Sequence, residues 1–452
     1  MPLTGEGHIA VFAFPFGSHA ASLLTLVHRL AAEAPNLRFS FLNTAMSNDK
    51  IFSTTQVNGC NIKPCNVDDG LPEGYVFSGN PLEAVDHFLK AMPDNFKRGV
   101  EAVVADTGKK ITCLLTDAFL WFAGVMAEQM GVPWVALWTA GPCSIAVHVY
   151  VDLIRTTIGP TEENADRTLG FIPGLSAIQA KDLPLEGVCG DLEQPPMSRL
   201  LYNMGIKVPH ATVLALNSFE EIDPTVTNDL KSKLQMVLNV GPFALTSPPP
   251  LPNSDTNGCI SWLDKHEAAS VAYLSFGTMA TPPPNELIAL GEALKAKGVP
   301  FLWSLKDTSK QHFPEGFLES IGTLGKIVPW APQLLVLEHP SVGVFVTHCG
   351  WNSVSESISG GVPMICRSFF GDQKLNSRLV EDVWRIGVCV EGGVFAKSGT
   401  INGLDVVLSS EKGKKMRENI AVLKESAKIA VGPNGSSTEN FKTLLDIVNK
   451  KP

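Results

Sequence analysis

His19 and Asp117 are two residues in the first third of the chain whose side chains could share acid–base chemistry. The apolar run 8–14 predicts a buried strand, and an amphipathic helix follows a short turn, with His19 in its first turn and Ser18 as its cap. A second apolar run, 111–116, predicts a strand that ends at Asp117. Ligands of open parallel sheets bind outside the carboxyl ends of the strands, so we expect both side chains at a ligand site.

The chemistry expected of this pair is proton abstraction. A helix N-terminus disfavours imidazolium, so we expect His19 to stay neutral near pH 7 and able to accept a proton. A carboxylate bonded to its other ring nitrogen would fix the tautomer and stabilise the charge that develops. The same positions are also typical of a helix-start histidine and an N-cap aspartate, and the spacing by itself favours this structural interpretation.

A second pattern indicates a phosphate site in the C-terminal half. Residues 342–346 predict a buried strand, 347–351 a glycine-containing turn, and 352–357 the start of a helix. Backbone N–H groups at such a turn and helix start can hold a diphosphate without Lys or Arg, with polar side chains at the mouth adding donors. The alternative is an ordinary strand–turn–helix in which Gly350 only permits the turn.

The elements around these motifs predict an α/β protein with two doubly wound parallel sheets. Continuous apolar strands are expected at 37–42, 111–116, 134–138 and 213–216, and again at 271–276, 301–305, 326–328, 342–346 and 362–366. The Pro-rich stretch between them predicts a domain boundary. We therefore expect an N-terminal domain at 1–245, a linker at 246–258, a second domain at 259–430 and a final helical segment at 431–452. Ser436 and Glu439 have the spacing of a capping box before that last helix.

Composition excludes several classes of protein. Among 452 residues, 44% are apolar and 18% charged, which is typical of a folded globular chain. The net charge of −9 argues against nonspecific nucleic-acid binding. The nine cysteines include no CxxC pair, which argues against a disulfide scaffold or a zinc ribbon. No run is long enough for a membrane span and the N-terminal apolar run is too short for a signal peptide, so we expect a cytoplasmic protein.

Residues 330–373 contain the most specific sequence motifs of the chain: W-A-P-Q at the start, T-H-C-G-W-N-S in the middle and D-Q at the end. This segment resembles the signature of plant UDP-glycosyltransferases. The stretches FPFGSHAASLL, DGLPEGYVFSGNP, LWTAGPCS, NSFEEIDP, SFGTMATPPP and GPNGSSTENF extend the resemblance over essentially the whole chain, particularly to flavonoid 3-O-glucosyltransferases. The resemblance implies the GT-B arrangement, in which two Rossmann-like domains face each other across a cleft. The first would bind the acceptor, the second the UDP-sugar, and the last helix would return to the first domain.

The resemblance also implies residue roles. Trp330 would stack on uracil, and Ala331 would offer its backbone to the uracil edge. Gln333 and Glu356 would hold the ribose hydroxyls. The diphosphate would be contacted by His348, Asn352, Ser353 and Thr278. The sugar would be contacted by Trp351, Asp372, Gln373 and Thr139. His19 and Asp117 match the family's catalytic dyad, which reverses the preference for the structural interpretation.

An aromatic slot for a flat polyphenol is expected in the first domain. Its candidate residues are Phe16, Phe119, Trp121, Phe122, His148 and Tyr150, and core packing is the favoured explanation for about half of them. Ser18 and Leu82 are further candidates for contact with the acceptor. Two positions depart from the family: Leu82 stands where some relatives have a polar residue, and Ser368 replaces a frequent proline and is expected to loosen the loop that carries Asp372. Gln373 stands where galactose-using relatives often have His, which favours UDP-glucose.

The expected function is inverting transfer of glucose from UDP-glucose to a flavonoid hydroxyl, with His19 as base, no metal cofactor and a monomeric chain. A same-fold epimerase or hydrolase and a non-catalytic UDP-sugar or flavonoid binding protein remain alternatives. A zinc site at His339, His348 and Cys349 lacks a fourth ligand with suitable spacing. The GxGxxA match at 5–10 precedes its strand instead of following it, so it does not indicate a dinucleotide site.

Overall fold

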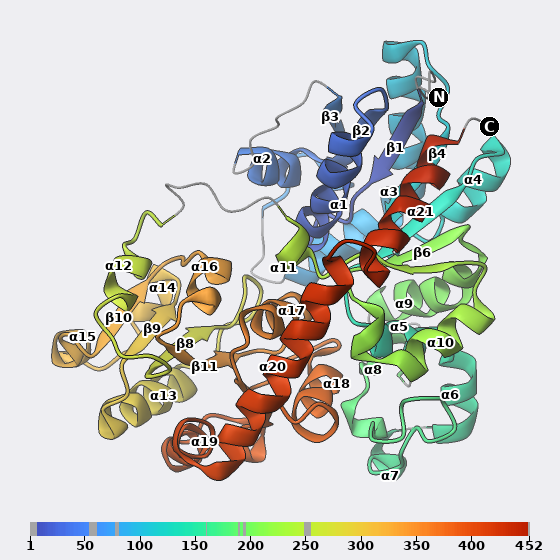
Figure 1. The fold of residues 1–452 in the computed structure, drawn as a ribbon. Coiled ribbons are helices and arrows are strands. Elements are labelled where there is room, and N and C mark those ends of the chain that lie inside the picture. Colours follow the sequence, from blue (N-terminus) through green and yellow to red (C-terminus); the bar gives the residue numbers. More distant parts are fainter. Residues whose placement is uncertain are drawn as a thin grey trace.

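The computed structural model describes residues 7–53, 61–76, 81–159, 161–188, 190–192, 196–247 and 255–450. The chain forms two parallel sheets, one on each side of the Pro-rich stretch, and this confirms the predicted fold class. The first sheet has the strand order β3-β2-β1-β4-β5-β6-β7 and the second β10-β9-β8-β11-β12-β13. Figure 1 shows the two sheets with helices on both faces of each.

The N-terminal sheet is built from short, largely buried strands: β1 (His8–Phe12), β2 (Arg38–Thr44), β3 (Ile62–Val67), β4 (Cys113–Asp117), β5 (Trp134–Trp138), β6 (Val213–Leu216) and β7 (Val237–Asn239). The helices of this half are α1 (His19–Glu33), α2 (Ala45–Ser53), α3 (Pro81–Thr107), α4 (Ala123–Met130), α5 (Pro142–Val149), α6 (Val151–Ile158), α7 (Thr161–Asn164), α8 (Leu185–Val188), α9 (Pro196–Lys207), α10 (Pro224–Lys233) and α11 (Phe243–Thr246), with a 3-10 turn η1 (Ala180–Asp182). Strands β1, β4 and β5 are buried along their whole length, because apolar side chains cover both faces of a parallel sheet.

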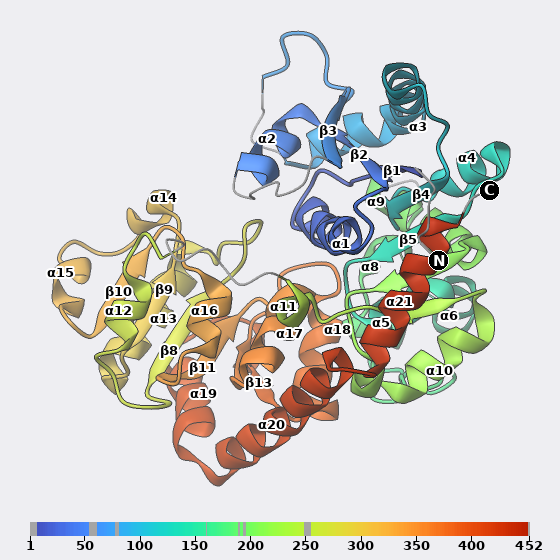
Figure 2. The same cartoon turned by 45° about the horizontal axis from the view of Figure 1, so that its top comes forward.

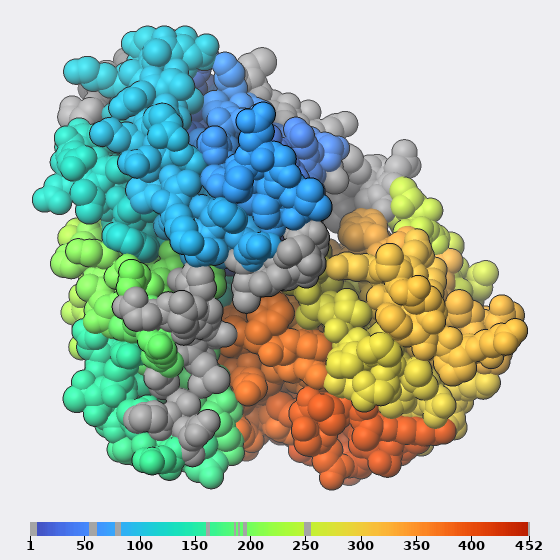
Figure 3. Space-filling model, turned by 180° about the vertical axis from the view of Figure 1, so that it is seen from behind, coloured from blue at the N-terminus to red at the C-terminus, as the bar shows by residue number. Residues whose placement is uncertain are grey.

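The C-terminal sheet comprises β8 (Val271–Ser275), β9 (Phe301–Ser304), β10 (Gly325–Val328), β11 (Val342–Thr347), β12 (Met364–Cys366) and β13 (Gly387–Cys389). Its helices are α12 (Cys259–Leu263), α13 (Pro284–Lys297), α14 (Asp307–Lys310), α15 (Phe317–Ile321), α16 (Gln333–Glu338), α17 (Trp351–Gly360), α18 (Gln373–Arg378), α19 (Lys397–Ser409) and α20 (Glu411–Val431), with the π-helical turn η4 (Leu379–Val383). The N-terminal sheet with its helices forms one lobe and the C-terminal sheet with its helices forms the other, and the two lobes lie against each other (Figure 3). One apolar cluster contains residues of both lobes.

The last two helices connect the lobes. Helix α20 runs from the C-terminal lobe toward α21 (Ser436–Asn449), which lies on the N-terminal lobe (Figures 1 and 2). Phe441 and Leu444 of α21 belong to the apolar core of the N-terminal sheet, and the guanidinium of Arg29 lies 4.0 Å from the ring centre of Phe441. Helix α21 therefore packs on the N-terminal sheet, although it follows the C-terminal sheet in the sequence.

One expected helix cap is wrong, and the other has the expected position but makes no capping hydrogen bond. Gly435, not Ser436, stands at the N-cap of α21, and the Ser436 hydroxyl donates to Glu221 Oε2 at 3.1 Å instead. Ser18 stands at the N-cap of α1 but its side chain makes no capping hydrogen bond. Its hydroxyl faces the other lobe.

Candidate active site

His19 and Asp117 form a direct pair. Strands β1 and β4 are parallel neighbours, so the turn after β1 and the end of β4 lie at the same edge of the sheet. Nδ1 of His19 lies 2.8 Å from Oδ2 of Asp117, whose Oδ1 accepts the backbone N–H of Phe119 at 2.9 Å. The carboxylate can only accept, so Nδ1 carries the hydrogen and Nε2 is left as the basic nitrogen. Asp117 is 1% exposed and His19 is 23% exposed, so solvent and ligands reach only the base.

The electrostatics of His19 differ from the expectation that the helix N-terminus would keep it neutral. Burial lowers the pKa of His19, but the charge and hydrogen bond of Asp117, with a smaller contribution from Asp372, outweigh burial and raise the pKa above 6.5. The expected direction was wrong, because the two carboxylates favour the imidazolium more than burial disfavours it. Oγ1 of Thr139, expected at the sugar, lies 3.2 Å from the same Nδ1.

Aromatic side chains surround this dyad. The rings of Phe119 and Phe14 lie 4.6 and 5.2 Å from the His19 ring, centre to centre, and Phe16 lies 5.3 Å from Phe14. Phe16 and Phe119 are only partly buried, so they offer apolar surface beside the base. A planar aromatic ligand would find edge and face contacts here.

His148 extends the aromatic surface as a neutral polar group. Its ring lies edge-on to Trp138 at 5.5 Å, it is 3% exposed, and its Nδ1 has no protein hydrogen-bond partner. Burial lowers the pKa of His148 to about 4, so the imidazole is uncharged at neutral pH. An uncharged, unpartnered ring nitrogen is suited to a ligand hydroxyl.

The other expected acceptor residues are buried or partly buried where the structure describes them. Phe122 packs on Phe12 and Phe96 inside the core, and Trp121 is partly buried against the same cluster. The Tyr150 hydroxyl donates to Asp229 at 2.8 Å. Leu82 lies in the first turn of α3, and its side chain is outside the described part of the structure.

A cavity of about 260 Å³ lies at the carboxyl edge of the C-terminal sheet. Several residues expected at the nucleotide are among those that line it: Thr278, Trp330, Ala331, Gln333 and Glu356. Trp330 is 54% exposed, which leaves its ring free for stacking on a base. This cavity has the apolar wall and few convergent polar groups of a small-molecule site.

A hydrogen-bonded chain orders the polar wall of this cavity. Tyr273 donates its hydroxyl to Oε1 of Gln333 at 3.1 Å, and Nε2 of Gln333 donates to Glu356 at 2.5 Å and to Ser353 Oγ at 3.2 Å. Burial raises the pKa of Glu356 to about 7, although the Gln333 hydrogen bond lowers it in part. The sequence did not single out Tyr273, whose hydroxyl orients Gln333.

The turn between β11 and α17 has the strand, glycine-containing turn and helix start that were expected of a phosphate cradle. Cys349 has a left-handed φ of 61°, and Gly350 at the N-cap provides no side-chain cap, so the first N–H groups of α17 remain available to an anion. A Cβ at Gly277 or Gly350 would lie 3.0 or 2.5 Å from the His348 ring, which explains why glycine occupies both positions. Burial lowers the pKa of His348 to about 4, and its Nδ1 has no protein partner, so it is a neutral group at this turn.

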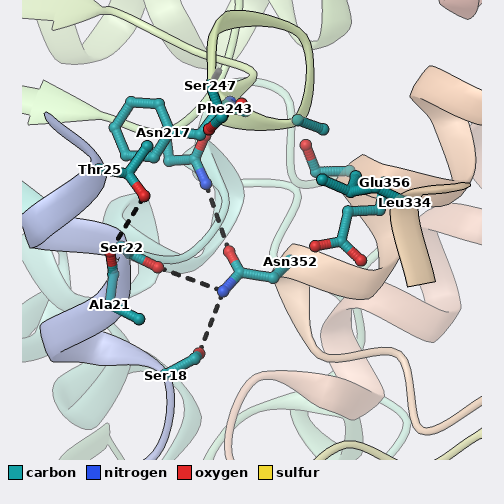
Figure 4. A pocket seen from close by; sticks show the side chains of 12 residues that line it. Ser18, Ala21, Ser22, Thr25, Asn217, Phe243, Ser247, Leu334, Asn352 and Glu356 are labelled. Atoms are coloured by element: carbon teal, nitrogen blue, oxygen red, sulfur yellow. Dashed lines mark hydrogen bonds between the residues drawn. The ribbon is translucent and has the colours of Figure 1, made fainter. Parts of the chain in front are cut away.

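Asn352 connects the two lobes. Its Nδ2 donates to Ser18 Oγ at 3.1 Å and Ser22 Oγ at 3.2 Å, and its Oδ1 accepts from Asn217 Nδ2 at 3.3 Å (Figure 4). These groups border a second cavity, of about 310 Å³, that Glu356 also lines. Asn352 was expected at the diphosphate and Ser18 at the acceptor, and the structure brings the two together at the domain boundary.

Trp351, expected at the sugar, is a domain contact. It is 4% exposed and its indole N–H donates to the backbone oxygen of Asn217 at 2.7 Å. A Cβ at Gly141 would lie 2.7 Å from its ring, so the two lobes meet closely here. The stretch NSFEEIDP was part of the family resemblance, but it did not indicate that Asn217 would bridge to α17.

Asp372 and Gln373 lie at the start of α18. Asn376 Nδ2 donates to Oδ2 of Asp372 at 3.0 Å and to the Cys349 oxygen at 3.0 Å. Burial raises the pKa of Asp372 despite that hydrogen bond. Oε1 of Gln373 accepts the backbone N–H groups of Phe369 and Phe370 at 2.8 and 3.2 Å.

Ser368, which was expected to loosen the loop that carries Asp372, makes two hydrogen-bond contacts in the structure. Its hydroxyl lies 2.6 Å from Ser377 Oγ, and its backbone oxygen accepts from Arg367 at 2.8 Å. Arg367 is itself held by two hydrogen bonds to Glu286. These hydrogen bonds hold the loop that carries Asp372 at Ser368.

Three further observations concern the described residues only. They include no group of three His, Cys, Asp or Glu placed to hold a metal ion. None of their helices is long and apolar enough to cross a membrane. The cysteines Cys65, Cys113, Cys143, Cys259, Cys349, Cys366 and Cys389 carry free thiols.

This chain is similar to known proteins over nearly its full length. The chain is 59% identical to a flavonol 3-O-glucosyltransferase of Actinidia chinensis var. chinensis, over 98% of this chain and 96% of the relative. The chain belongs to the UDP-glycosyltransferase family. The family model described as UDP-glucoronosyl and UDP-glucosyl transferase matches residues 250–444 of this UDP-glycosyltransferase.

Other relatives of this UDP-glycosyltransferase agree with that assignment. It is 54% identical to an anthocyanidin 3-O-glucosyltransferase of Vitis vinifera, over 99% and 98% of the two chains. A crystal structure of a UDP-glucose:anthocyanidin 3-O-glucosyltransferase in complex with UDP superposes with a TM-score of 0.93 at 44% identity, over 98% and 99% of the two chains. The GT-B arrangement is thereby confirmed.

Proposed function

We propose that this UDP-glycosyltransferase transfers glucose from UDP-glucose to a flavonoid hydroxyl, the 3-hydroxyl of a flavonol or anthocyanidin, with inversion at the anomeric carbon. The observation that carries the proposal is the His19–Asp117 pair with its free Nε2 among aromatic rings. The names of its relatives supply the substrate class, since those at 59% and 54% identity are a flavonol and an anthocyanidin 3-O-glucosyltransferase.

The reaction requires a base because a phenolic hydroxyl has a pKa of about 10. Nε2 of His19 takes the proton as the acceptor oxygen attacks the anomeric carbon, and the bond from that carbon to the diphosphate oxygen breaks with its electron pair going to UDP. Asp117 stabilises the imidazolium, and its effect on the pKa of His19 brings base and phenol closer in proton affinity. Attack from the face opposite UDP inverts the anomeric centre.

The leaving UDP would be held by neutral donors. The open N-terminus of α17 and the uncharged imidazole of His348 offer hydrogen bonds to developing negative charge. Trp330 would hold the uracil, and Glu356 with Gln333 the ribose hydroxyls. We propose on this basis that no metal cofactor is required.

Glucose is the proposed sugar over galactose. The curated relatives include an anthocyanidin 3-O-galactosyltransferase of Actinidia chinensis var. chinensis at 52% identity, over 98% of each chain, so overall similarity does not distinguish the sugars. Gln373 is the residue whose type favours glucose. We also propose a monomer, since both lobes of the site come from one chain, and a cytoplasmic location, in which the free thiols would stay reduced.

A glycoside assay tests the proposal. Purified protein is incubated with UDP-glucose and a flavonol, and the product is isolated and its linkage determined by NMR. A flavonol 3-O-β-glucoside that is absent with His19→Ala supports the proposal. A changed or hydrolysed UDP-sugar without glycoside would instead identify an epimerase or hydrolase, and tight UDP binding without turnover would identify a binding protein.

A further inference from the structure

Helix α18 joins the loop next to the dyad to the opposite lobe. Asp372 and Gln373 stand at its first end and Arg378 at its last. The charge of Asp372 is one of those that raise the pKa of His19. The ends of the helix are about 8 Å apart at 1.5 Å per residue, so a shift at one end moves the other.

Arg378 attaches the far end of α18 to the N-terminal lobe. Its Nε donates to Oδ2 of Asp182 at 2.9 Å and its Nη2 to Oδ1 at 3.2 Å, and Nη2 also lies 3.3 Å from Oε1 of Gln179. This is the two-point fork that a guanidinium forms with a carboxylate and that lysine cannot reproduce. The Asp182 side chain is 8% exposed and that of Arg378 25%, so solvent screens the pair only in part.

The Asp182 side of the contact is itself held in place. Oδ2 of Asp182 accepts the backbone N–H of Gln179 at 3.0 Å, which closes the turn η1. The backbone of η1 is tied to the preceding loop by hydrogen bonds from Ala180 to Arg167 and from Lys181 to Ala165, each 2.9 Å. The carboxylate is therefore a fixed point on the N-terminal lobe.

The near end of α18 is equally well held. Asn376 bonds Asp372 and the Cys349 oxygen of the phosphate cradle, and Gln373 bonds the backbone of the loop before it. The contact at Arg378 therefore fixes a unit that already carries two candidate sugar residues and touches the cradle.

We propose that Arg378 is a positioning residue whose pairing with Asp182 aligns Asp372 and Gln373 with His19 across the domain boundary. The proposal rests on the proposed glucosyl transfer and adds a role for an ion pair outside the site. With the pair intact, the sugar of the donor is held with its anomeric carbon facing the base. Without it, α18 shifts and the sugar is misaligned, while the uracil and ribose, which other elements would bind, keep their positions.

The chain offers a matched control. Nη1 of Arg378 also donates to Asp382 at 2.6 Å, one helical turn away in the same lobe. Asp182→Asn weakens a contact between the lobes, whereas Asp382→Asn weakens a contact within one lobe. Each variant removes one charged partner of the Arg378 guanidinium. A general effect of losing an ion pair would be the same in both variants.

The test compares donor binding and turnover in the wild type and the two variants. For Asp182→Asn we expect kcat to fall on the order of tenfold and the Kd for UDP-glucose to rise severalfold, with the Kd for UDP unchanged within about twofold, because misalignment by about 1 Å is enough for such losses. For Asp382→Asn we expect all three within about twofold of wild type. Equal kcat in the two variants, or equal loss of UDP and UDP-glucose affinity, would overturn the proposal.

Two additions keep the result interpretable. If Asp182→Asn does not fold, Arg378→Gln leaves the Gln179–Asp182 bond intact and is expected to show the same selective loss of UDP-glucose affinity. The double variant Asp182→Asn/Arg378→Gln should lose no more than Arg378→Gln alone, whereas additive losses would contradict a shared contact. Calorimetric Kd values need no acceptor, so a wild type that binds UDP-glucose but glucosylates no flavonoid refutes the proposed function while the Kd comparison still tests Arg378.

Discussion

Replacing Asp117 by Asn separates the catalytic interpretation of the dyad from a structural one. Asparagine keeps the size of the side chain and an oxygen for the Phe119 N–H at 2.9 Å. Toward His19 it can present an N–H, which turns Nδ1 into an acceptor and puts the ring hydrogen on Nε2. The base is then blocked by its own hydrogen.

The expected magnitude follows from the role of the base. A positioned base contributes about 10² to 10⁴-fold, so Asp117→Asn and His19→Ala should each lower kcat by at least about 10²-fold. Asp117→Asn exchanges a charge-assisted hydrogen bond for a neutral one, which should cost only about 1 kcal/mol of the free energy of unfolding. The Kd for UDP, which the other lobe binds, should barely change.

The pH dependence gives a second readout. Since the pKa of His19 is raised above 6.5, the acid limb of kcat/KM should lie above pH 6.5 in the wild type and move to lower pH in Asp117→Asn. The folded pKa exceeds the unfolded one, so the pair stabilises the fold fully below pH 6.5 and loses this effect as pH rises through the folded pKa. The difference in Tm between wild type and variant should therefore be larger at pH 6 than at pH 8.

The assay measures kcat, the pH profile and Tm for the wild type, both variants and Asp106→Asn, an exposed ion-pair control. Near-normal kcat in Asp117→Asn, with a lowered Tm, would refute the catalytic reasoning and assign the pair to structure. A kcat loss of equal size in Asp106→Asn would refute it as well.

The remaining predictions concern the donor and metal. EDTA should leave turnover unchanged in steady-state assays, and loss of activity restored by Mg²⁺ or Mn²⁺ would contradict this. The ratio of kcat/KM for UDP-glucose over that for UDP-galactose should be about 5 to 150, equivalent to about 1–3 kcal/mol. Gln373→His should lower this ratio, because two hydrogen bonds to the loop depend on Oε1 of Gln373. A wild-type ratio below one, or a ratio that Gln373→His leaves unchanged, would contradict the prediction. The affinity for UDP, measured by calorimetry, should fall as the pH drops through about 7, because Glu356 is then protonated. Glu356→Gln should weaken UDP binding and make it independent of pH in this range. Since the folded pKa of Glu356 is raised, its ionisation destabilises the fold above pH 7, and Glu356→Gln should have a higher Tm than wild type at pH 8 with the gap closing toward pH 4. Trp330→Ala should cost UDP binding about 1–3 kcal/mol with little change in Tm, because the ring is exposed.

The sequence was sufficient for most of the two sheets. Strands β5 and β6 have the predicted limits, and β4 and β11 differ by one or two residues, because strands covered on both faces are continuous apolar runs. It did not indicate β3, β7 and β13. Edge strand β3 contains Lys63 and Pro64 with exposed positions, and β7 and β13 have three residues each, too few for a pattern.

The sequence by itself also determined which residues could form the site, because parallel strands place their carboxyl ends at one edge and His19 and Asp117 follow two such strands. Only the tertiary structure decided how they act. The raised pKa of His19, the contacts of Asn352 with Ser18 and Ser22 and the burial of Trp351 depend on residues about a hundred or more positions apart. Local patterns carry no information on such contacts, since the electrostatic and packing energies involved arise only when the fold brings these distant residues together.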